Sequence, residues 1–314
     1  MAELIASREK LPENERMLQI QRNVSLKDYT SWLVGGEAEY FCLPQTEEEL
    51  EEALRFAKDE KIPWTVLSGG TNVLVSDEGI EGLVICLRKF AGVRIQESPD
   101  FLRLECLAGT GKSELLKIFL KQKLAPALFL AGIPGDVGGG VVMNAGVAES
   151  FVPREFHEIV EWVEVLREEG AELRRLRLRK DEIQWSYRHS SGWQPGIVVK
   201  AGLIWENKPE PEILRKVRDA NKVRLSKQPL DLPSCGSVFV NPAGYKSAQL
   251  IDGCGLKGYQ VGGAQVSLKH ANFIVNVGGA KARDILSVIE HVQKTVKARK
   301  GVDLQTEVVR LGPF

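Results

Sequence analysis

Two glycine-rich stretches are the parts of this sequence best suited to binding a charged ligand. The first, LSGGTNVLV at residues 67–75, places two glycines and a Thr–Asn pair between two apolar runs. The second, AGIPGDVGGGVVMNAG at residues 131–146, has five glycines between 132 and 140. Glycine lets the backbone approach a ligand closely, and successive N–H groups can form a nest for phosphate. One such loop fits a tight strand connection equally well, but two favour a ligand with several phosphates, such as a dinucleotide.

The familiar nucleotide-binding motifs do not fit either stretch. CLAGTGKSE, at residues 106–114, ends like a P-loop, but Cys106 stands where that motif requires its first glycine. Lys112 and Ser113 are therefore interpreted as the start of the following helix. The GxGxxG pattern also fails, because Glu114 and Met143 occupy its last position in the two possible frames. The sequence thus indicates a ligand that is bound in another way.

Clear periodic patterns surround the two loops. Residues 46–61 predict a helix with a capping box formed by Thr46 and Glu49. A strand precedes the first loop, and Gly301 is expected to end the last helix. Further helices are predicted at 111–125, 212–225 and 281–299, and strands at 82–87, 102–108, 159–166, 197–204, 238–240, 272–278 and 304–312.

Length and composition exclude several classes of protein. The 314 residues, 43% of them hydrophobic, allow two or three domains, and the net charge of zero gives no general attraction to nucleic acid. The longest basic tract, RRLRLRK at 174–180, alternates like the solvated face of a strand. No apolar run is long enough to span a bilayer, and the charged N-terminus lacks a signal-peptide core. Five scattered cysteines and four histidines predict reduced thiols, with no disulfide and no metal site.

Six segments in a fixed order make the sequence similar to a known family. They are LSGGTNVLVSDEGIEGLVI, AGIPGDVGGGVVMNAG, WSYRHSS, PSCGSVFVNPAG, GGAQVSLKHANFIVN and LQTEVVRLG. Each is weak alone, but together they closely resemble the UDP-N-acetylenolpyruvoylglucosamine reductase (MurB) family over residues 29–312. The short span between Arg188 and Lys227 leaves little room for the extra substrate loop of type I members, so we expect type II.

The resemblance implies an α+β fold with three parts. Two α/β subdomains, residues 1–90 and 91–207, would form a FAD-binding module of the vanillyl-alcohol-oxidase type. Residues 208–314, after the proline-rich boundary at 206–213, would form an α+β substrate domain. FAD would be bound without a covalent link, since neither loop has a histidine nearby. The implied cofactor-binding residues are Ser68, Gly69, Gly70, Thr71, Asn72, Ile133, Pro134, Gly135, Gly138, Gly139, Asn144, Ala145 and Gly146.

The sequence departs from the family just after the second loop. The family usually continues NAGA-Tyr-Gly, whereas this chain reads NAGVAESFVPREF. The missing aromatic residue and glycine predict different flavin contacts near Val147 and Ala148.

The implied reaction reduces an enolpyruvyl ether to a lactyl ether during peptidoglycan precursor synthesis. Hydride passes from NADPH through FAD N5 to C3 of the enolpyruvyl group. Negative charge then develops at C2, so the reaction needs a cation beside the adjacent carboxylate and a proton donor at C2. The resemblance assigns the carboxylate contact to Arg188, the proton to Ser237 and stabilisation to Glu307. The alternative roles are a surface ion pair for Arg188, a turn hydroxyl for Ser237 and an outward-facing strand carboxylate for Glu307.

Three further residues are expected at the substrate. Tyr187, Lys227 and Asn241 would bind it, although packing, solvated charge and turn formation explain them too. Cys235 has no neighbouring base in the sequence and is interpreted as a packing residue. We expect a cytoplasmic monomer whose partners are small molecules. The rival interpretations are another flavin oxidase of the same superfamily and a non-catalytic nucleotide-binding module, which would need no Arg188, Ser237 and Glu307 set.

Overall fold

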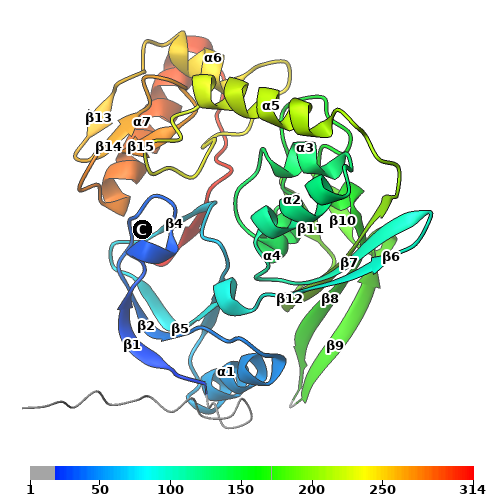
Figure 1. The fold of residues 1–314 in the computed structure, drawn as a ribbon. Coiled ribbons are helices and arrows are strands. Elements are labelled where there is room, and N and C mark those ends of the chain that lie inside the picture. The colour runs from blue at the N-terminus through cyan, green and yellow to red at the C-terminus, as the bar shows by residue number, and fades with distance from the viewer. Residues whose placement is uncertain (1–17, 171) are drawn as a thin grey trace, which may run out of the picture.

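The computed structural model describes residues 18–170 and 172–314, and Figure 1 shows three groups of elements in this part of the chain. The first group is a sheet in the order β1-β2-β5-β3, formed by β1 (Gln21–Ser25), β2 (Glu37–Cys42), β5 (Ile80–Cys86) and β3 (Trp64–Leu67). β5 pairs in parallel with both β2 and β3, as in a βαβ unit. The predicted absence of a signal-peptide core concerns residues that lie almost wholly outside the described part.

Helix α1 (Glu47–Asp59) packs on this first sheet through Leu50, Ala53, Leu54 and Ala57. The Thr46 hydroxyl accepts a hydrogen bond from the Glu49 N–H at 3.2 Å, as predicted. The second hydrogen bond of the predicted capping box is absent, so this part of the prediction is wrong. The Glu49 carboxylate accepts a hydrogen bond from the N–H of Gln45 and not from that of Thr46. The helix therefore begins where the sequence indicates, with one half of the motif.

The second group is an antiparallel sheet with helices on one face. Its order is β6-β7-β12-β8-β9, formed by β6 (Val93–Glu97), β7 (Phe101–Leu107), β12 (Ile197–Glu206), β8 (Val160–Glu169) and β9 (Glu172–Arg179). Helices α2 (Lys112–Lys121), α3 (Pro126–Leu130) and α4 (Val137–Val142) pack against it in one apolar core (Figure 1). The basic tract lies in edge strand β9, whose side chains are exposed or half-buried, as its alternation predicts.

A two-stranded hairpin and four short 3₁₀ turns complete the first two groups. The hairpin joins β10 (Gln184–Ser186) to β11 (His189–Ser191) and carries Tyr187 and Arg188 at its turn. The 3₁₀ turns are η2 (Lys27–Tyr29), η3 (Leu87–Lys89), η4 (Phe156–Glu158) and η5 (Lys180–Glu182).

The third group contains the C-terminal elements. Helix α5 (Ile213–Lys227) leads to α6 (Ser247–Asp252), the antiparallel sheet β13 (Gln260–Val261), β14 (Ala264–Val266) and β15 (Ile274–Asn276), and helix α7 (Ala282–Lys300). Gly301, with φ of 69°, ends α7 as predicted. The strand predicted at 238–240 is wrong, because only Phe239 forms an isolated bridge, to Thr306. Asn272 takes up both neighbouring N–H groups, those of Val238 and Phe239, so no ladder can extend there.

The C-terminal strand returns to the first group. β16 (Val309–Leu311) pairs in parallel with β4 (Val73–Val75), which directly follows the first glycine loop. Just before β16, the Glu307 carbonyl accepts a hydrogen bond from the Asn72 side chain at 2.8 Å. Glu307 therefore precedes the strand in which it was predicted, and the pairing fixes it beside the first loop.

Three further findings bear on the class of protein. In residues 18–170 and 172–314, no helix is long and apolar enough to cross a membrane. The same residues contain no group of three or more His, Cys, Asp or Glu side chains placed to hold a metal ion. All five cysteines are buried and unpaired.

Candidate active site

A cavity of about 1650 Å³ is lined by residues from all three groups of elements. Pockets for one small molecule usually measure roughly 300–1,000 Å³, so this one has room for a cofactor together with a second ligand. Both glycine loops, the β10–β11 turn, helix α5 and the segment at 233–237 contribute to its wall. Every site residue predicted from the sequence lines this cavity except Asn144.

The first glycine loop, residues 68–72, presents free N–H groups to the cavity. Its carbonyls are anchored: that of Gly70 accepts from the Ser31 N–H at 3.0 Å, and that of Asn72 from the Val309 N–H at 3.0 Å. By contrast, the N–H groups of residues 69–72 donate no hydrogen bond to any residue the structure describes. Gly70 has a φ of 66°, which favours glycine. The loop is therefore a rigid set of donors suited to an anion such as a diphosphate.

The second glycine loop uses most of its N–H groups internally. The Gly138 N–H donates to the Ala108 carbonyl at 2.7 Å, and the Gly140 N–H donates to the Asp136 carbonyl at 2.9 Å. Asp136 caps helix α4, because its Oδ1 accepts from the Gly139 N–H at 3.1 Å and from the Ser68 hydroxyl at 2.6 Å. This second loop therefore contributes shape and close approach rather than a row of donors.

Asn144 lies behind the cavity wall rather than in it. It is fully buried, and its Nδ2 donates to Glu155 Oε2 and to the Ser186 carbonyl, both at 3.0 Å. Its Oδ1 accepts from the His157 N–H at 3.1 Å. With each polar atom of the side chain already bonded, Asn144 ties the second loop to the β10–β11 hairpin, and the structure does not support direct contact with a ligand.

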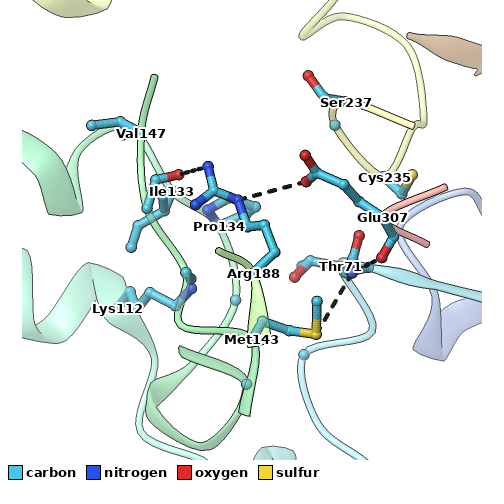
Figure 2. Close-up of a pocket in the computed structure, with 18 of the residues that line it drawn as sticks. Thr71, Lys112, Ile133, Pro134, Met143, Val147, Arg188, Cys235, Ser237 and Glu307 are labelled. Atoms are coloured by element: carbon cyan, nitrogen blue, oxygen red, sulfur yellow. Dashed lines mark hydrogen bonds and ion pairs between the residues drawn. The ribbon is translucent and has the colours of Figure 1, made fainter. Parts of the chain in front are cut away.

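Arg188 is held at the centre of the cavity by contacts on several sides (Figure 2). Its Nη2 donates to the Gly146 carbonyl at 2.8 Å, and its Nε lies 3.6 Å from Glu307 Oε2. Its Nη1 lies 3.8 Å from Glu155 Oε1, yet it is a buried nitrogen without a hydrogen-bond partner among the described residues. A buried donor left without a partner is costly. The guanidinium is therefore fixed in place at the cavity wall, with Nη1 enclosed by protein.

Glu307 is a partly desolvated carboxyl with two partners. Burial raises its pKa above the ordinary value, while the charge of Arg188 and the hydrogen bond from Tyr187 oppose that rise. The Tyr187 hydroxyl donates to Glu307 Oε1 at 2.9 Å, and burial together with this carboxylate raises the pKa of Tyr187 to about 12. Tyr187 therefore remains a donor at neutral pH. Arg188 also stacks over the Tyr187 ring, with 4.5 Å from Cζ to the ring centroid.

Ser237 is brought beside Glu307 by the backbone. The Glu307 N–H donates to the carbonyl of Val238 at 2.8 Å, so the two segments are neighbours (Figure 2). The Ser237 hydroxyl makes no hydrogen bond within the described part of the chain and lines the cavity. Cys235 is buried, and burial raises the pKa of its thiol well above the usual value, which agrees with a packing role. Guanidinium, carboxyl and free hydroxyl together can hold a substrate carboxylate and protonate an adjacent carbon.

The remaining predicted substrate residues lie farther along the same cavity. Lys227 ends helix α5, and Asn241 accepts a hydrogen bond from the Ser247 N–H at 2.9 Å through its Oδ1. Asn241 thus shapes the turn into α6, one of the two roles predicted for it, and still lines the cavity.

Several polar residues at or beside the cavity were not predicted as site residues, among them Asp136, Lys112 and Glu155. Asp136 and Lys112 lie at the second loop, and Glu155 lies beside Arg188. The sequence itself indicated a role for Asp136, because an aspartate directly before a helix is a common N-cap. Glu155 falls in the segment that departs from the family pattern, which offered no signal.

Two family models match this chain. The FAD binding domain matches residues 38–175, and the C-terminal domain of UDP-N-acetylenolpyruvoylglucosamine reductase matches residues 228–311. The expected order of a FAD-binding module followed by a separate C-terminal domain is thereby confirmed.

The residues of the cavity fit FAD. The free N–H groups of residues 69–72 suit its diphosphate, and the glycines of both loops permit close approach. The volume accommodates the flavin and its adenine nucleotide and leaves space for a substrate. Arg188 lines the same cavity as both glycine loops.

Relatives match along nearly the whole chain. UDP-N-acetylenolpyruvoylglucosamine reductase of Caldanaerobacter subterraneus subsp. tengcongensis is 38% identical, with 99% of each chain covered, and that of Synechococcus sp. (strain RCC307) is 39% identical, with 95% of each covered. The crystal structure of the Thermus caldophilus enzyme superimposes with a TM-score of 0.76 at 34% identity, covering 94% of this chain and all of that one. This chain therefore belongs to the UDP-N-acetylenolpyruvoylglucosamine reductase family.

Proposed function

We propose that this FAD-dependent oxidoreductase uses NADPH to reduce UDP-N-acetylglucosamine enolpyruvate to UDP-N-acetylmuramate for peptidoglycan synthesis. The observation that carries the proposal is the convergence of Arg188, Ser237 and Glu307 on one cavity, each with a distinct chemical capacity. The full-length similarity to UDP-N-acetylenolpyruvoylglucosamine reductases supports this choice of substrate. Bound FAD supplies hydride transfer, which none of the side chains can provide.

Arg188 binds the carboxylate of the enolpyruvyl group. Negative charge moves onto this carboxylate during reduction, so a fixed cation stabilises the transition state more than the ground state. The hydrogen bond from Nη2 to the Gly146 carbonyl prevents rotation of the guanidinium. Arg188 lines the cavity, which places its positive charge beside the space for the substrate.

Ser237 delivers the proton to C2, and Glu307 assists. The Ser237 hydroxyl has no hydrogen-bond partner among the residues described, so it can turn toward the substrate carbon. Desolvation raises the pKa of Glu307, which allows the carboxyl to hold a proton or a short hydrogen bond near the developing charge. Tyr187 fixes the orientation of Glu307.

The remaining assignments follow from position in the cavity. Tyr187, Lys227 and Asn241 bind the nucleotide part of the substrate or NADPH, and the two glycine loops bind FAD without a covalent link. Residues 1–90, 91–207 and 208–314 act as two cofactor subdomains and a substrate domain of a type II enzyme. The protein works as a cytoplasmic monomer on small molecules, without nucleic acid or membrane partners.

The variant Ser237→Ala tests the proposed chemistry. Removing one hydroxyl without adding bulk should leave FAD binding and reduction by NADPH nearly unchanged. Placed general acids contribute about 10²–10⁴-fold, so reoxidation of the reduced enzyme by the enolpyruvyl substrate should slow by that factor in single-turnover stopped flow. Ser237→Cys is the matched control and should retain part of the rate.

Two results would contradict this assignment. Reoxidation of Ser237→Ala within a few-fold of the wild-type rate would make Ser237 a turn residue. A wild-type protein whose flavin NADPH does not reduce would support the non-catalytic nucleotide-binding module instead.

A further inference from the structure

Lys112 is a buried lysine that lies between the two glycine loops and has no partner for its ammonium among the described residues. Its side chain lines the cavity, and only 4% of the residue is exposed. Its backbone N–H donates to the Gly135 carbonyl at 3.0 Å, which fixes the start of α2 against the second loop. Its ammonium makes no hydrogen bond or ion pair with any residue in 18–170 or 172–314.

The position of the ammonium is defined by Gly135. A Cβ built on Gly135 would lie 3.6 Å from Lys112 Nζ and 2.9 Å from Thr71 Oγ1. The ammonium of Lys112, at the start of α2, and the hydroxyl of Thr71, on the first loop, therefore both lie against the same glycine of the second loop. Figure 2 shows the Lys112 side chain extending toward the second loop near Pro134.

A buried ammonium needs compensation from an opposite charge or from hydrogen-bond acceptors. Burial lowers the pKa of Lys112 to about 8, and the negative charge of Asp136 only partly opposes this shift. Among the described residues, Asp136 forms no ion pair with Lys112, and its Oδ1 accepts hydrogen bonds from the Ser68 hydroxyl and the Gly139 N–H. The described residues thus leave the positive charge of Lys112 without a direct partner.

We infer that Lys112 contacts the diphosphate of the bound FAD, opposite the free N–H groups of residues 69–72. The first loop offers backbone donors and Lys112 adds a full positive charge, so the two together match a doubly charged anion. The inference rests on FAD being the ligand of this cavity. The alternative is that Lys112 serves only to balance Asp136 within the fold.

Flavin-free protein carrying Lys112→Met tests this inference. Methionine keeps the length and apolar stem of lysine and removes the charge. Dissociation constants would be measured for FAD, for ADP by displacement of FAD, and for riboflavin. We expect roughly 10- to 100-fold weaker binding of FAD and ADP and unchanged binding of riboflavin, since only the first two carry a diphosphate. Lys216→Met is the matched control, because Lys216 lines the same cavity but already pairs with Glu210.

Three outcomes would overturn the inference. Equal weakening of riboflavin and FAD would indicate a distorted pocket, and unchanged FAD affinity would exclude the contact. If the double variant Lys112→Met, Asp136→Asn regained the wild-type FAD affinity, the role of Lys112 would be to balance the charge of Asp136. Thermal unfolding of the flavin-free variant, with Lys112→Gln as a second substitution, separates these results from a folding defect. Wild-type protein that binds no flavin would contradict the proposed function instead.

Discussion

The two glycine loops have similar compositions but opposite hydrogen-bonding states. In the first loop, the carbonyls are anchored to neighbouring segments and the N–H groups of residues 69–72 are free. In the second, the N–H groups of residues 137–140 are bonded within the protein, and Gly138 and Gly140 are buried. Glycine therefore serves ligand approach in the first loop and close packing of a short helix in much of the second.

The contrast teaches that glycine content alone does not identify a phosphate site. The deciding feature is which N–H groups remain after the fold has formed. Asp136 and the carbonyls of Ala108 and Thr110 accept hydrogen bonds from the N–H groups at the start of helix α4. The N–H groups of residues 69–72 donate to no residue that the structure describes. The predictions below test this difference, from the largest expected effect to the smallest.

Gly70→Ala should weaken FAD binding more than either of the other glycine substitutions below. The added Cβ would lie 1.9 Å from the Tyr29 carbonyl oxygen, and a φ of 66° adds strain for any other residue. The loop must shift, so we expect the FAD dissociation constant to rise by about 100-fold or more, measured by flavin fluorescence quenching. Gly301→Ala is the control, because Gly301 has a φ of 69° but nothing within 4 Å of the added Cβ. Equal affinities of Gly70→Ala and wild type would show that this loop does not hold the cofactor.

Gly140→Ala should destabilise the protein without a comparable change in FAD affinity. The added Cβ would lie 2.7 Å from the Phe156 ring, inside a packed core. Overpacking of this kind typically costs about 1–3 kcal/mol, which urea unfolding of the flavin-free protein would measure. The comparison between the loops would be wrong if FAD binding fell as strongly as in Gly70→Ala while stability stayed the same.

Gly139→Ala should have the smallest effect, and the effects on stability and binding should have opposite signs. Gly139 lines the cavity, and only Asp136 Oδ1 lies near the added Cβ, at 3.2 Å. Replacing a helical glycine should stabilise the flavin-free protein by about 0.5–1 kcal/mol. The new methyl group should weaken FAD binding by roughly fivefold, which calorimetric titration would detect. Unchanged affinity would mean that the cofactor does not approach this helix.

Features determined by local sequence could be predicted. The Thr46 cap and the Gly301 end of α7 depend on residues within one turn, and both lie where the sequence indicates. The position of the first loop between two strands was predicted for the same reason. The family resemblance supplied the set of Arg188, Ser237 and Glu307, which the fold brings to one cavity although they are far apart in sequence.

Features determined by long-range pairing could not be predicted. The pairing of β16 with β4 joins segments more than 200 residues apart, and it positions Glu307. The strand expected at 238–240 failed because Asn272 captures its N–H groups. The burial of Asn144 depends on acceptors contributed by Glu155 and Ser186. Each case turns on a partner that local patterns do not identify.

The visible spectrum of the purified protein, followed without oxygen, tests the central claim most directly. We predict a yellow protein that loses its flavin absorbance when NADPH is added and regains it when UDP-N-acetylglucosamine enolpyruvate follows. Acid precipitation should then release the flavin into the supernatant, as expected for a non-covalent cofactor. A colourless protein that takes up no FAD, or a bleached protein whose colour the enolpyruvyl substrate does not restore, would contradict the account.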